Sequence, residues 1–568
     1  MKNNKAKSTA NLFVTGVVVL TIANLLVKVI GVALKVPLDW VFNTGVPESA
    51  KGDAMGFYSA AYDVYVWLYM ISTAGLPVAI SMMVSESRAK GNLREPKKIF
   101  SMTLALLTAV GTVGTCILIF GSRYIANNIY KLPGLEYALC AIAPTLLFIC
   151  ISAAIRGYFQ GYQIMTPSAV SEVIESFGKL VFGMTLAYIA MNMLPADLVM
   201  LKDGIEGKYA IAAAMTISGL TLGVGVSLIY LFIKKATFKS AVYDLEFKNH
   251  HSYDKPVRSN AKIIKSLIAI AIPITISSSV MSFTSMLDGV IISNTMQDAL
   301  KLSADDVTGI IGLFKTHVVT LFNMPPALIY PISGSIVPYL SGIIAKGDKE
   351  KATKIMNSSL RVATMIALPC ALGLSTLSEP IIRLFFNSSF SPDTCNTPAL
   401  LSIQAIAVFF VGMLAMTTSI LQAHKQERKP IISMLAGGAV KILSSYLLIG
   451  KIGIYGAPVG TLLCYITIVL FNFFFVAKYV KFIPRFTQVF LKPLISAVIC
   501  SGAALLSYRV LEHYGLSFRI AVIAAILIAM VVYAIMIILL RALRKEDFEI
   551  IPKGQKLYNI LSKARLIK

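Results

Sequence analysis

Charged residues lie inside several stretches of this chain that are otherwise apolar enough to cross a bilayer. Lys28, Lys179, Asp288 and Lys441 each occupy a separate apolar run, spread over both halves of the sequence. A charge in hydrocarbon costs at least about 2.5 kcal/mol, so such a residue usually faces a polar cavity rather than lipid. Because most of these charges are positive, the pattern predicts a membrane transporter whose cavity attracts an anion.

The composition places the chain among membrane proteins. Of 568 residues, 56% are hydrophobic and 14% are charged, with a mean hydropathy of +0.74. A soluble protein carries roughly a quarter charged residues. Apolar segments of about 20 residues, the length of a bilayer-spanning helix, recur from end to end. We therefore expect an all-α polytopic protein of the bacterial cytoplasmic membrane.

The apolar windows predict fourteen spans. They lie near 12–34, 58–84, 100–121, 136–156, 167–191, 209–233, 263–292, 310–343, 357–378, 397–421, 431–450, 454–477, 489–508 and 518–541. Lys and Arg gather in alternate loops and at both ends of the chain, which is typical of cytoplasmic segments. This distribution accounts for the net charge of +24 without a nucleic-acid partner. It predicts that both termini are cytoplasmic.

A weak internal repeat predicts the domain organisation. The segments 80–92 and 336–348 share Ile, Ser and Ala-Lys-Gly positions, and Gln160 and Lys179 are echoed by Gln422 and Lys441. Two lobes of six spans each would insert in the same orientation, related by a pseudo-two-fold axis along the membrane normal. The expected domains are an N-terminal lobe (1–233), a cytoplasmic linker (234–262), a C-terminal lobe (263–478), spans thirteen and fourteen (479–541) and a basic cytoplasmic tail (542–568).

The lysines are the first candidates for substrate binding. Lys28 lies several residues from either end of its span, too far for easy escape to the interface. Lys35 follows seven residues later on a similar face. Lys179 follows Glu175 by four residues, a spacing that allows an ion pair within one helix. Lys179 and Lys441 at repeat-related positions would put positive charge on both walls of a cavity, which suits a pyrophosphate. A self-neutralised polar stripe between packed helices is the alternative for Lys179.

Four further candidates lie nearer the span ends or are acidic. Arg156, at the cytoplasmic end of span four, is an interfacial anchor or a gate residue. Lys315 begins span eight beside His317 and is a candidate for the cavity wall. Asp63 in span two and Asp288 in span seven either pair with a lysine or bind a coupling cation.

The chain offers little chemistry for catalysis. It contains no Walker A, HExxH or GxSxG sequence, and only five histidines. We therefore expect no enzyme activity, no metal and no cofactor. Transport would be driven by a Na⁺ or H⁺ gradient, by the membrane potential or by consumption of the product.

Four segments resemble the polysaccharide-transporter branch of the multidrug/oligosaccharidyl-lipid/polysaccharide exporter superfamily. They read NLLVKVIGVALKVP (24–37), TAGLPVAISMMVSE (73–86), AIRGYFQGYQIMTP (154–167) and IGIYGAPVGTLLCY (452–465). Together they resemble the stage V sporulation protein B family and its relatives among MurJ-type lipid II flippases. The resemblance implies a V-shaped pair of six-helix lobes, with spans thirteen and fourteen forming a groove for a polyprenyl tail.

The resemblance also implies roles for single residues. Lys28 matches a basic cavity residue on the first helix, and Asp288 is similar to an acidic residue that takes part in a sodium site in some relatives. The helix-eleven positions that would complete that site read here as Lys441 and Ser445. The ammonium group of Lys441 could replace the cation, so the sequence departs from the sodium-coupled pattern.

The resulting hypothesis is a flippase for an anionic, undecaprenyl-pyrophosphate-linked saccharide, with lipid II as the leading substrate. Another lipid-linked polysaccharide or a sporulation cortex precursor is the alternative. A multidrug/cation antiporter would need an acidic pocket, and a membrane glycosyltransferase would need catalytic groups on its outer loops. The expected partners are the lipid-linked substrate, membrane lipids and cell-wall polymerases, with the protein itself a monomer.

Overall fold

The computed structural model describes residues 23, 26–31, 33–47, 50–90, 92, 94–193, 207–238, 257–386, 395–544 and 546–550. Within them every regular element is a helix, which confirms the all-α prediction. Eleven helices of this part are long and apolar enough to cross a membrane, or twelve if a bent pair is counted as one span. The chain divides into two compact units, Met1–Gly312 and Leu313–Lys568. Most of the predicted linker (234–262) and of the predicted basic tail (542–568) lies outside the described residues.

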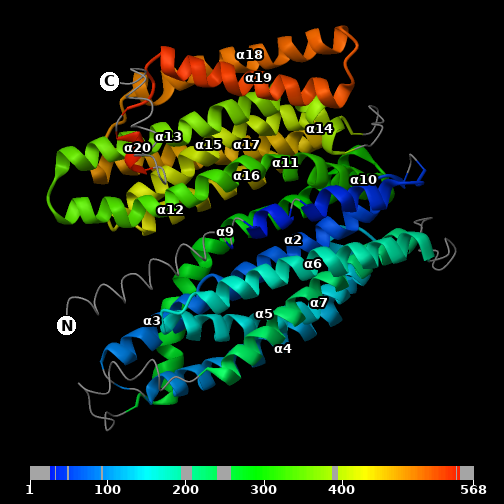
Figure 1. Cartoon of the computed structure of the whole chain (residues 1–568). Helices are drawn as coiled ribbons and strands as arrows, with labels where there is room; N and C mark the ends of the chain where they lie inside the picture. Colours follow the sequence, from blue (N-terminus) through cyan, green and yellow to red (C-terminus); the bar gives the residue numbers. More distant parts are fainter. Residues whose placement is uncertain are drawn as a thin grey trace. The chain divides into compact units, whose positions relative to one another are not determined.

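The first unit consists of long, closely packed helices (Figure 1). After a helical stretch within residues 26–43 come α2 (Asp53–Thr73), α3 (Leu76–Ala89), α4 (Glu95–Tyr124), α5 (Leu135–Gly161), α6 (Thr166–Met193), α7 (Gly207–Thr237), α9 (Asn260–Leu300) and α10 (Ala304–Leu313). A π-helical turn, η2 (Ile125–Tyr130), extends α4. The helix α9 is longer at its C-terminal end than the predicted span 263–292, and it is bent by 49° between Ile276 and Ser278.

The span predicted at 58–84 is broken. Helix α2 ends at Thr73 and α3 begins at Leu76, with Pro77 in the first turn of α3. A Cβ on Gly75 would lie 3.1 Å from the carbonyl carbon of Ala271 in α9, with two other atoms closer still. Glycine is therefore required here, because any side chain would push α9 away.

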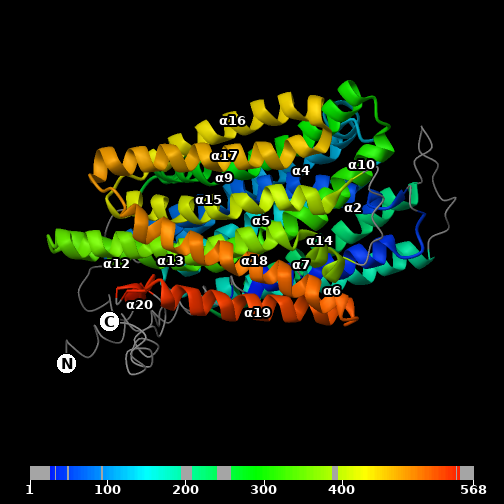
Figure 2. The ribbon, with the colours of Figure 1, turned by 90° about the horizontal axis from the view of Figure 1, so that it is seen from above.

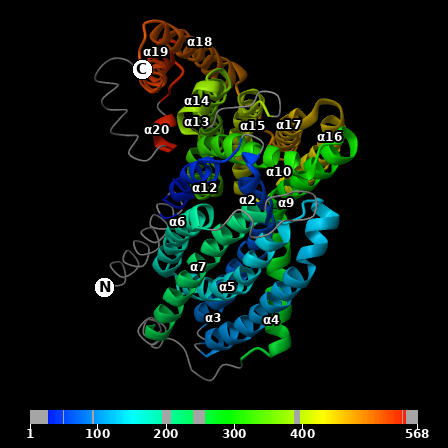
Figure 3. The same ribbon diagram turned by 90° about the vertical axis from the view of Figure 1, so that its right-hand side faces the viewer.

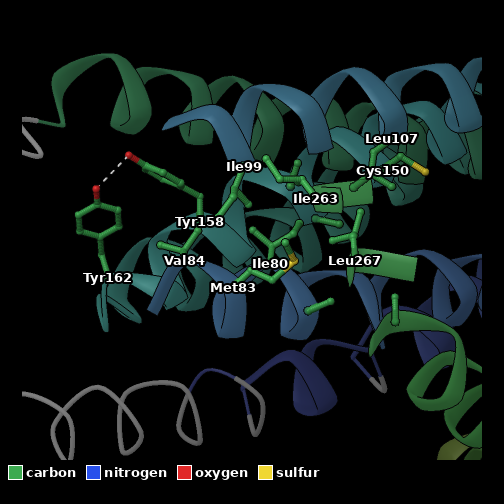
Figure 4. Packing of buried hydrophobic residues seen from close by; sticks show 14 residues of the cluster. Ile80, Met83, Val84, Ile99, Leu107, Cys150, Tyr158, Tyr162, Ile263 and Leu267 are labelled. Atoms are coloured by element: carbon green, nitrogen blue, oxygen red, sulfur yellow. Dashed lines mark hydrogen bonds between the residues drawn. The ribbon is translucent and has the colours of Figure 1, made fainter. Parts of the chain in front are cut away.

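One core of this unit is a cluster of buried apolar residues from α3, α4, α5 and α9. Figure 4 shows Ile80, Met83 and Val84 facing Ile99, Leu107, Cys150, Tyr158, Ile263 and Leu267. The start of α9 is also tied to α4, since Arg258 Nε donates to Glu95 Oε1 at 2.6 Å. These contacts fix α9 within the first unit, although the predicted lobe boundary at 234–262 precedes it. The lobe limits predicted from the sequence, 1–233 and 263–478, stay predictions.

Helices α6 and α7 approach each other through glycines (Figure 3). A Cβ on Gly178 would lie 2.6 Å from Gly223 Cα, and a Cβ on Gly223 would lie 2.6 Å from the backbone nitrogen of Lys179. Backbones this close leave no room for a methyl group. The contact sets the position of the α6 turn that carries Glu175 and Lys179.

We expect Gly223→Ala to lower the free energy of unfolding by about 1–3 kcal/mol, because the added methyl group overpacks the α6–α7 contact. The matched control is Gly225→Ala on the same helix, where the nearest atom to the new Cβ, Phe148 Cε2, is 3.7 Å away. There the change should be neutral or stabilising by up to about 1 kcal/mol, since alanine favours the helix. Thermal unfolding in detergent measures both, and equal effects would refute the close contact.

The second unit is built from α12 (Met324–Ala345), α13 (Lys349–Thr376), α14 (Ser378–Phe385), α15 (Thr397–Ala423), α16 (Arg428–Ile452), α17 (Gly456–Phe475), α18 (Lys492–His513), α19 (Phe518–Leu539) and α20 (Asp547–Ile550). Helices α16 and α17 lie side by side, as do α18 and α19 (Figure 2). The span predicted at 310–343 is helical but interrupted before Pro325. The chain forms η4 (Phe314–Val319) and the short α11 (Thr320–Phe322) before α12 begins ahead of Pro325 and Pro326.

The C-terminal pair α18 and α19 is fastened to α13. The hydroxyl of Tyr533 donates to the Met365 carbonyl at 2.7 Å, and the chain after α19 turns back to place Asp547 beside Arg361. Arg361 is 2% exposed and Asp547 0%. Arg361 Nε donates to Asp547 Oδ2 at 2.9 Å, and the Ser358 hydroxyl donates to the same carboxylate. A buried ion pair therefore anchors the end of the described chain.

Candidate functional site

Polar side chains from α2, α5 and α6 meet inside the first unit. Arg156 of α5, Glu175 and Lys179 of α6 and Tyr65 of α2 form what we call the Arg156 network. All four are buried or half-buried, although each helix is otherwise apolar. Buried charges are expected to be paired and hydrogen-bonded. The contacts described next meet that expectation.

Arg156 is the fixed centre of the network. Its Nη2 donates to Glu175 Oε2 at 2.9 Å and to the Ser227 hydroxyl at 3.4 Å, and its Nε donates to the Ser171 hydroxyl at 2.9 Å. Glu172 lies at the edge of the network, 4.0 Å from Nη1. The guanidinium group is 5% exposed, so it is oriented from several sides at once. Only arginine has the planar fork that this arrangement uses.

Lys179 joins the same carboxylate from the other side. Its Nζ donates to Glu175 Oε1 at 2.8 Å and to the Tyr65 hydroxyl at 3.1 Å. The ion pair predicted from the spacing of Glu175 and Lys179 is thus confirmed. The two carboxylate oxygens of Glu175 are divided between two cations, one from α5 and one from its own helix. The sequence could not predict this bridge, because it depends on how α5 packs on α6 and α7.

The network faces the interior of the unit. On α6 the exposed apolar residues Phe177, Val181 and Tyr188 recur at helical spacing and form one stripe. Lys179 is two residues from each of the first two, which puts it on the opposite side of the helix. Its side chain is 17% exposed, compared with 6% for Glu175 and for Arg156. Lys179 is therefore not a snorkelling lipid-facing residue.

A row of tyrosines on α2 lines the network, and sequence reasoning missed it. Tyr58, Tyr62, Tyr65 and Tyr69 recur at i, i+4, i+7 and i+11, so they share one face of the helix. Their successive ring centroids are 5.6–5.8 Å apart. The tyrosine spacing was the available signal. The row carries hydroxyl groups and aromatic faces to which lysines can bind by cation–π attraction.

The two lysines of the first helical stretch are placed differently. Lys35 is half-buried, and its Nζ lies 5.8 Å from the centroid of the Tyr62 ring. It therefore reaches the tyrosine row that also contacts Lys179. Lys28 is exposed, one to two turns earlier on the same stretch. The structure brings Lys35 and Lys179 to one row of aromatic rings, while Lys28 is not part of that cluster.

The acidic candidates lie on facing helices of the first unit. Asp288 of α9 is 4% exposed, and Asp63 of α2 is half-buried. A Cβ on Gly289, next to Asp288, would lie 3.8 Å from Asp63 Oδ2 and 3.6 Å from the ring of Tyr130. The C-terminal half of α9 is held there, since Gln297 donates to the Lys131 carbonyl at 3.0 Å. The two carboxylates thus share one region of the α2–α9 contact.

Lys441 and Lys315 lie in the second unit. Lys441 in α16 is 8% exposed and close to the buried Ser445, while Lys315 in η4 is 6% exposed. His317, in the same turn, stacks on Phe386 with ring centroids 4.3 Å apart. Both lysines are thus buried in apolar helices, as a polar function inside the membrane requires.

The network places two cations around one oxyanion, the carboxylate of Glu175. A phosphate, like a carboxylate, can accept charge-assisted hydrogen bonds from two cations through two of its oxygens. Among the described residues there is no cluster of three metal-ligating side chains. The sequence of the chain matches a known family. A sequence profile described as lipid II flippase MurJ covers residues 80–526. The chain belongs to this family.

Curated relatives extend over most of the chain. The lipid II flippase MurJ of Bacillus subtilis is 23% identical over 477 residues, 82% of each chain. Stage V sporulation protein B of the same organism is 23% identical over 552 residues, covering 95% of this chain and 98% of its own length. The MurJ family assignment therefore rests on both units.

Solved structures support the fold. A lipid II flippase MurJ in an inward closed conformation superposes with a TM-score of 0.65 at 18% identity, covering 92% of this chain and 99% of its own. A multidrug resistance MATE family transporter of the MOP superfamily, in an inward-facing conformation, superposes with a TM-score of 0.55 at 15% identity. The superposition covers 81% of this chain and 99% of the transporter. The MurJ family fold thus resembles that of the MATE transporters.

Proposed function

We propose that this protein moves lipid II across the bacterial cytoplasmic membrane by alternating access. The observation that carries the proposal is the MurJ family match over residues 80–526, which spans both units. Buried cations inside apolar helices are consistent with a substrate that carries a pyrophosphate. The isoprenoid tail would stay in lipid while the charged headgroup passes through the protein.

The finer architecture is part of the proposal. We infer fourteen spans: two six-span lobes related by a pseudo-two-fold axis along the membrane normal, and a C-terminal pair, α18 and α19. This pair would border the isoprenoid tail of the substrate. Helices at each range predicted from 58–84 onward support the count. The alternation of basic loops supports cytoplasmic termini. The domain limits stay those predicted from the sequence.

Specific residues receive roles in this proposal. Lys28, Lys35, Lys179, Lys441, Arg156 and Lys315 would bind or guide the pyrophosphate. Asp63 and Asp288 would bind a coupling Na⁺ or H⁺ or compensate a lysine, with the membrane potential as the other driving force. The protein would act as a monomer without catalytic chemistry or a cofactor, and would release its substrate to cell-wall polymerases.

Growth rescue tests the proposal. In a bacterium depleted of its own lipid II flippase, the wild-type protein should restore growth. Lys28→Ala should lower the rescue about tenfold, the effect of losing one charge-assisted contact of about 1.4 kcal/mol. Equal expression of both proteins in the membrane is the control. Absence of rescue by correctly inserted wild type would contradict lipid II as the substrate, and full rescue by Lys28→Ala would refute the role of Lys28.

A second candidate function follows from one relative. Stage V sporulation protein B matches this chain over 98% of its own length. A lipid-linked glycan precursor used in sporulation is therefore the alternative substrate. Rescue of a sporulation defect without rescue of vegetative growth would favour it. A cationic-drug antiporter is disfavoured, because the intramembrane charge is mainly basic.

A further inference from the structure

Glu175 lies between two cations inside the first unit. Its Oε1 accepts from Lys179 Nζ at 2.8 Å and its Oε2 accepts from Arg156 Nη2 at 2.9 Å. One carboxylate thus bridges two cations through two oxygens, as a phosphate does. Any anion that binds Lys179 must compete with this carboxylate.

The two cations differ in how firmly they are held. Arg156 is also bonded to Ser171 and Ser227 and is 5% exposed, so its guanidinium group is held by partners on two helices besides its own. The Lys179 side chain is 17% exposed and has a flexible four-carbon stem. If Lys179 turned away, Glu175 would keep Arg156 as its counter-ion. The burial cost of an unpaired carboxylate would therefore be avoided.

The tyrosine row offers Lys179 a second set of partners. Lys179 Nζ lies 5.1 Å from the centroid of the Tyr65 ring, and Tyr62, the neighbouring ring, is contacted by Lys35. A cation that moves along an aromatic face keeps part of its electrostatic stabilisation while it leaves a carboxylate. The path from Glu175 toward Lys35 is therefore lined by groups that tolerate an ammonium ion.

We propose that Glu175 is a positioning residue that holds Lys179 in a resting state, and that a phosphate of the substrate displaces it from Lys179. The exchange rests on the proposed function, because it requires a pyrophosphate-bearing substrate. In the resting state the pair Glu175–Lys179 is neutral, so non-specific anions are poorly attracted. After release of the substrate, Lys179 returns to Glu175, which prevents the product from rebinding.

Affinity for an isoprenyl pyrophosphate tests the exchange. With farnesyl pyrophosphate as the probe and purified protein in detergent, Glu175→Gln should bind about five- to tenfold more tightly than wild type, because Lys179 is freed. Lys179→Met should bind about tenfold more weakly. The double variant Glu175→Gln/Lys179→Met should match Lys179→Met alone, since Glu175 acts only through Lys179.

Glu172→Gln is the matched control. It removes the same charge one turn earlier on α6, but Glu172 contacts Arg156 at 4.0 Å rather than Lys179. Any gain in affinity from this change should be smaller and should persist in the Lys179→Met background. Glu175→Asp, which keeps the charge with a shorter reach, should give an intermediate affinity, and it replaces Glu175→Gln if that variant does not fold.

Two results would overturn the exchange: an affinity unchanged by Glu175→Gln, or a gain that survives in the double variant. Growth rescue separates this failure from failure of the proposed function. Suppose the wild type restores growth, but the effect of Glu175→Gln on affinity is the same with and without Lys179. That result refutes only the exchange. A wild type that neither restores growth nor binds farnesyl pyrophosphate refutes the flippase assignment.

Discussion

Arg156→Met should lower the free energy of unfolding by about 1–3 kcal/mol, because the buried Glu175 Oε2 and the Ser171 and Ser227 hydroxyls lose their guanidinium donor while Lys179 remains the counter-ion of Glu175. The guanidinium group bonds Glu175, Ser171 and Ser227, which come from two other helices. Its loss removes the guanidinium bonds that join α5 to α6 and α7 at this level. We also expect growth rescue to fall, since Glu175 and Lys179 lose their fixed position. Thermal unfolding in detergent and rescue measured at equal expression give the two readouts.

Two variants control the Arg156 prediction. Arg123→Met removes the same charge from the exposed side of α4 and should change stability by less than about 0.5 kcal/mol. Arg156→Lys keeps the charge but loses the fork, so its effect should be smaller than that of Arg156→Met. An unfolding curve of Arg156→Met that coincides with wild type would contradict the buried network.

Asp547→Asn should have a larger effect in the second unit, lowering the free energy of unfolding by about 3–5 kcal/mol. It leaves the Arg361 guanidinium group, which is 2% exposed, without its counter-charge. Asp547 also accepts from the Arg544 backbone nitrogen at 2.8 Å, so the turn that forms α20 should loosen. Because this turn follows α19, we expect the α18–α19 pair to become more accessible to protease at its C-terminal end.

The paired variant separates charge burial from packing. Arg361→Met/Asp547→Leu removes both charges and should recover most of the stability lost in Asp547→Asn, because a buried pair can be replaced by apolar residues at little cost. Glu546→Gln, at the adjacent position, is the matched control and should change stability by less than about 0.5 kcal/mol. Equal stability of the single and double variants would refute the ion pair as the anchor.

The all-α class and the helix positions were predictable because apolar runs of membrane length determine them locally. The breaks were partly predictable. Pro77 and Pro325–Pro326 mark real helix starts, whereas Pro331 and Pro338 lie inside the continuous helix α12. In the membrane, neighbouring helices can satisfy the backbone groups that a proline frees. A proline in the sequence therefore indicates a candidate break, and packing decides whether the helix ends.

The site was predictable only where partners lie on one helix. The pair Glu175–Lys179 follows from its spacing, and Lys179 was correctly placed away from lipid. The bridge from Glu175 to Arg156 joins residues 19 apart, and the pair Arg361–Asp547 joins residues 186 apart. Such contacts depend on helix packing, to which the sequence pattern gives no direct access. The tyrosine row of α2 could have been predicted from its helical spacing. It was missed because the site was predicted from charged residues and tyrosine is uncharged.

Movement of lipid II between leaflets is the measurement closest to the central claim. Purified protein would be reconstituted into vesicles that contain labelled lipid II, and an impermeant enzyme that modifies the headgroup would be added outside. The account predicts that wild type exposes the inner-leaflet pool as well as the outer one. Lys179→Met should slow this exposure about tenfold. Vesicles in which only the outer-leaflet pool reacts, with correctly inserted wild type present, would contradict lipid II transport by this protein.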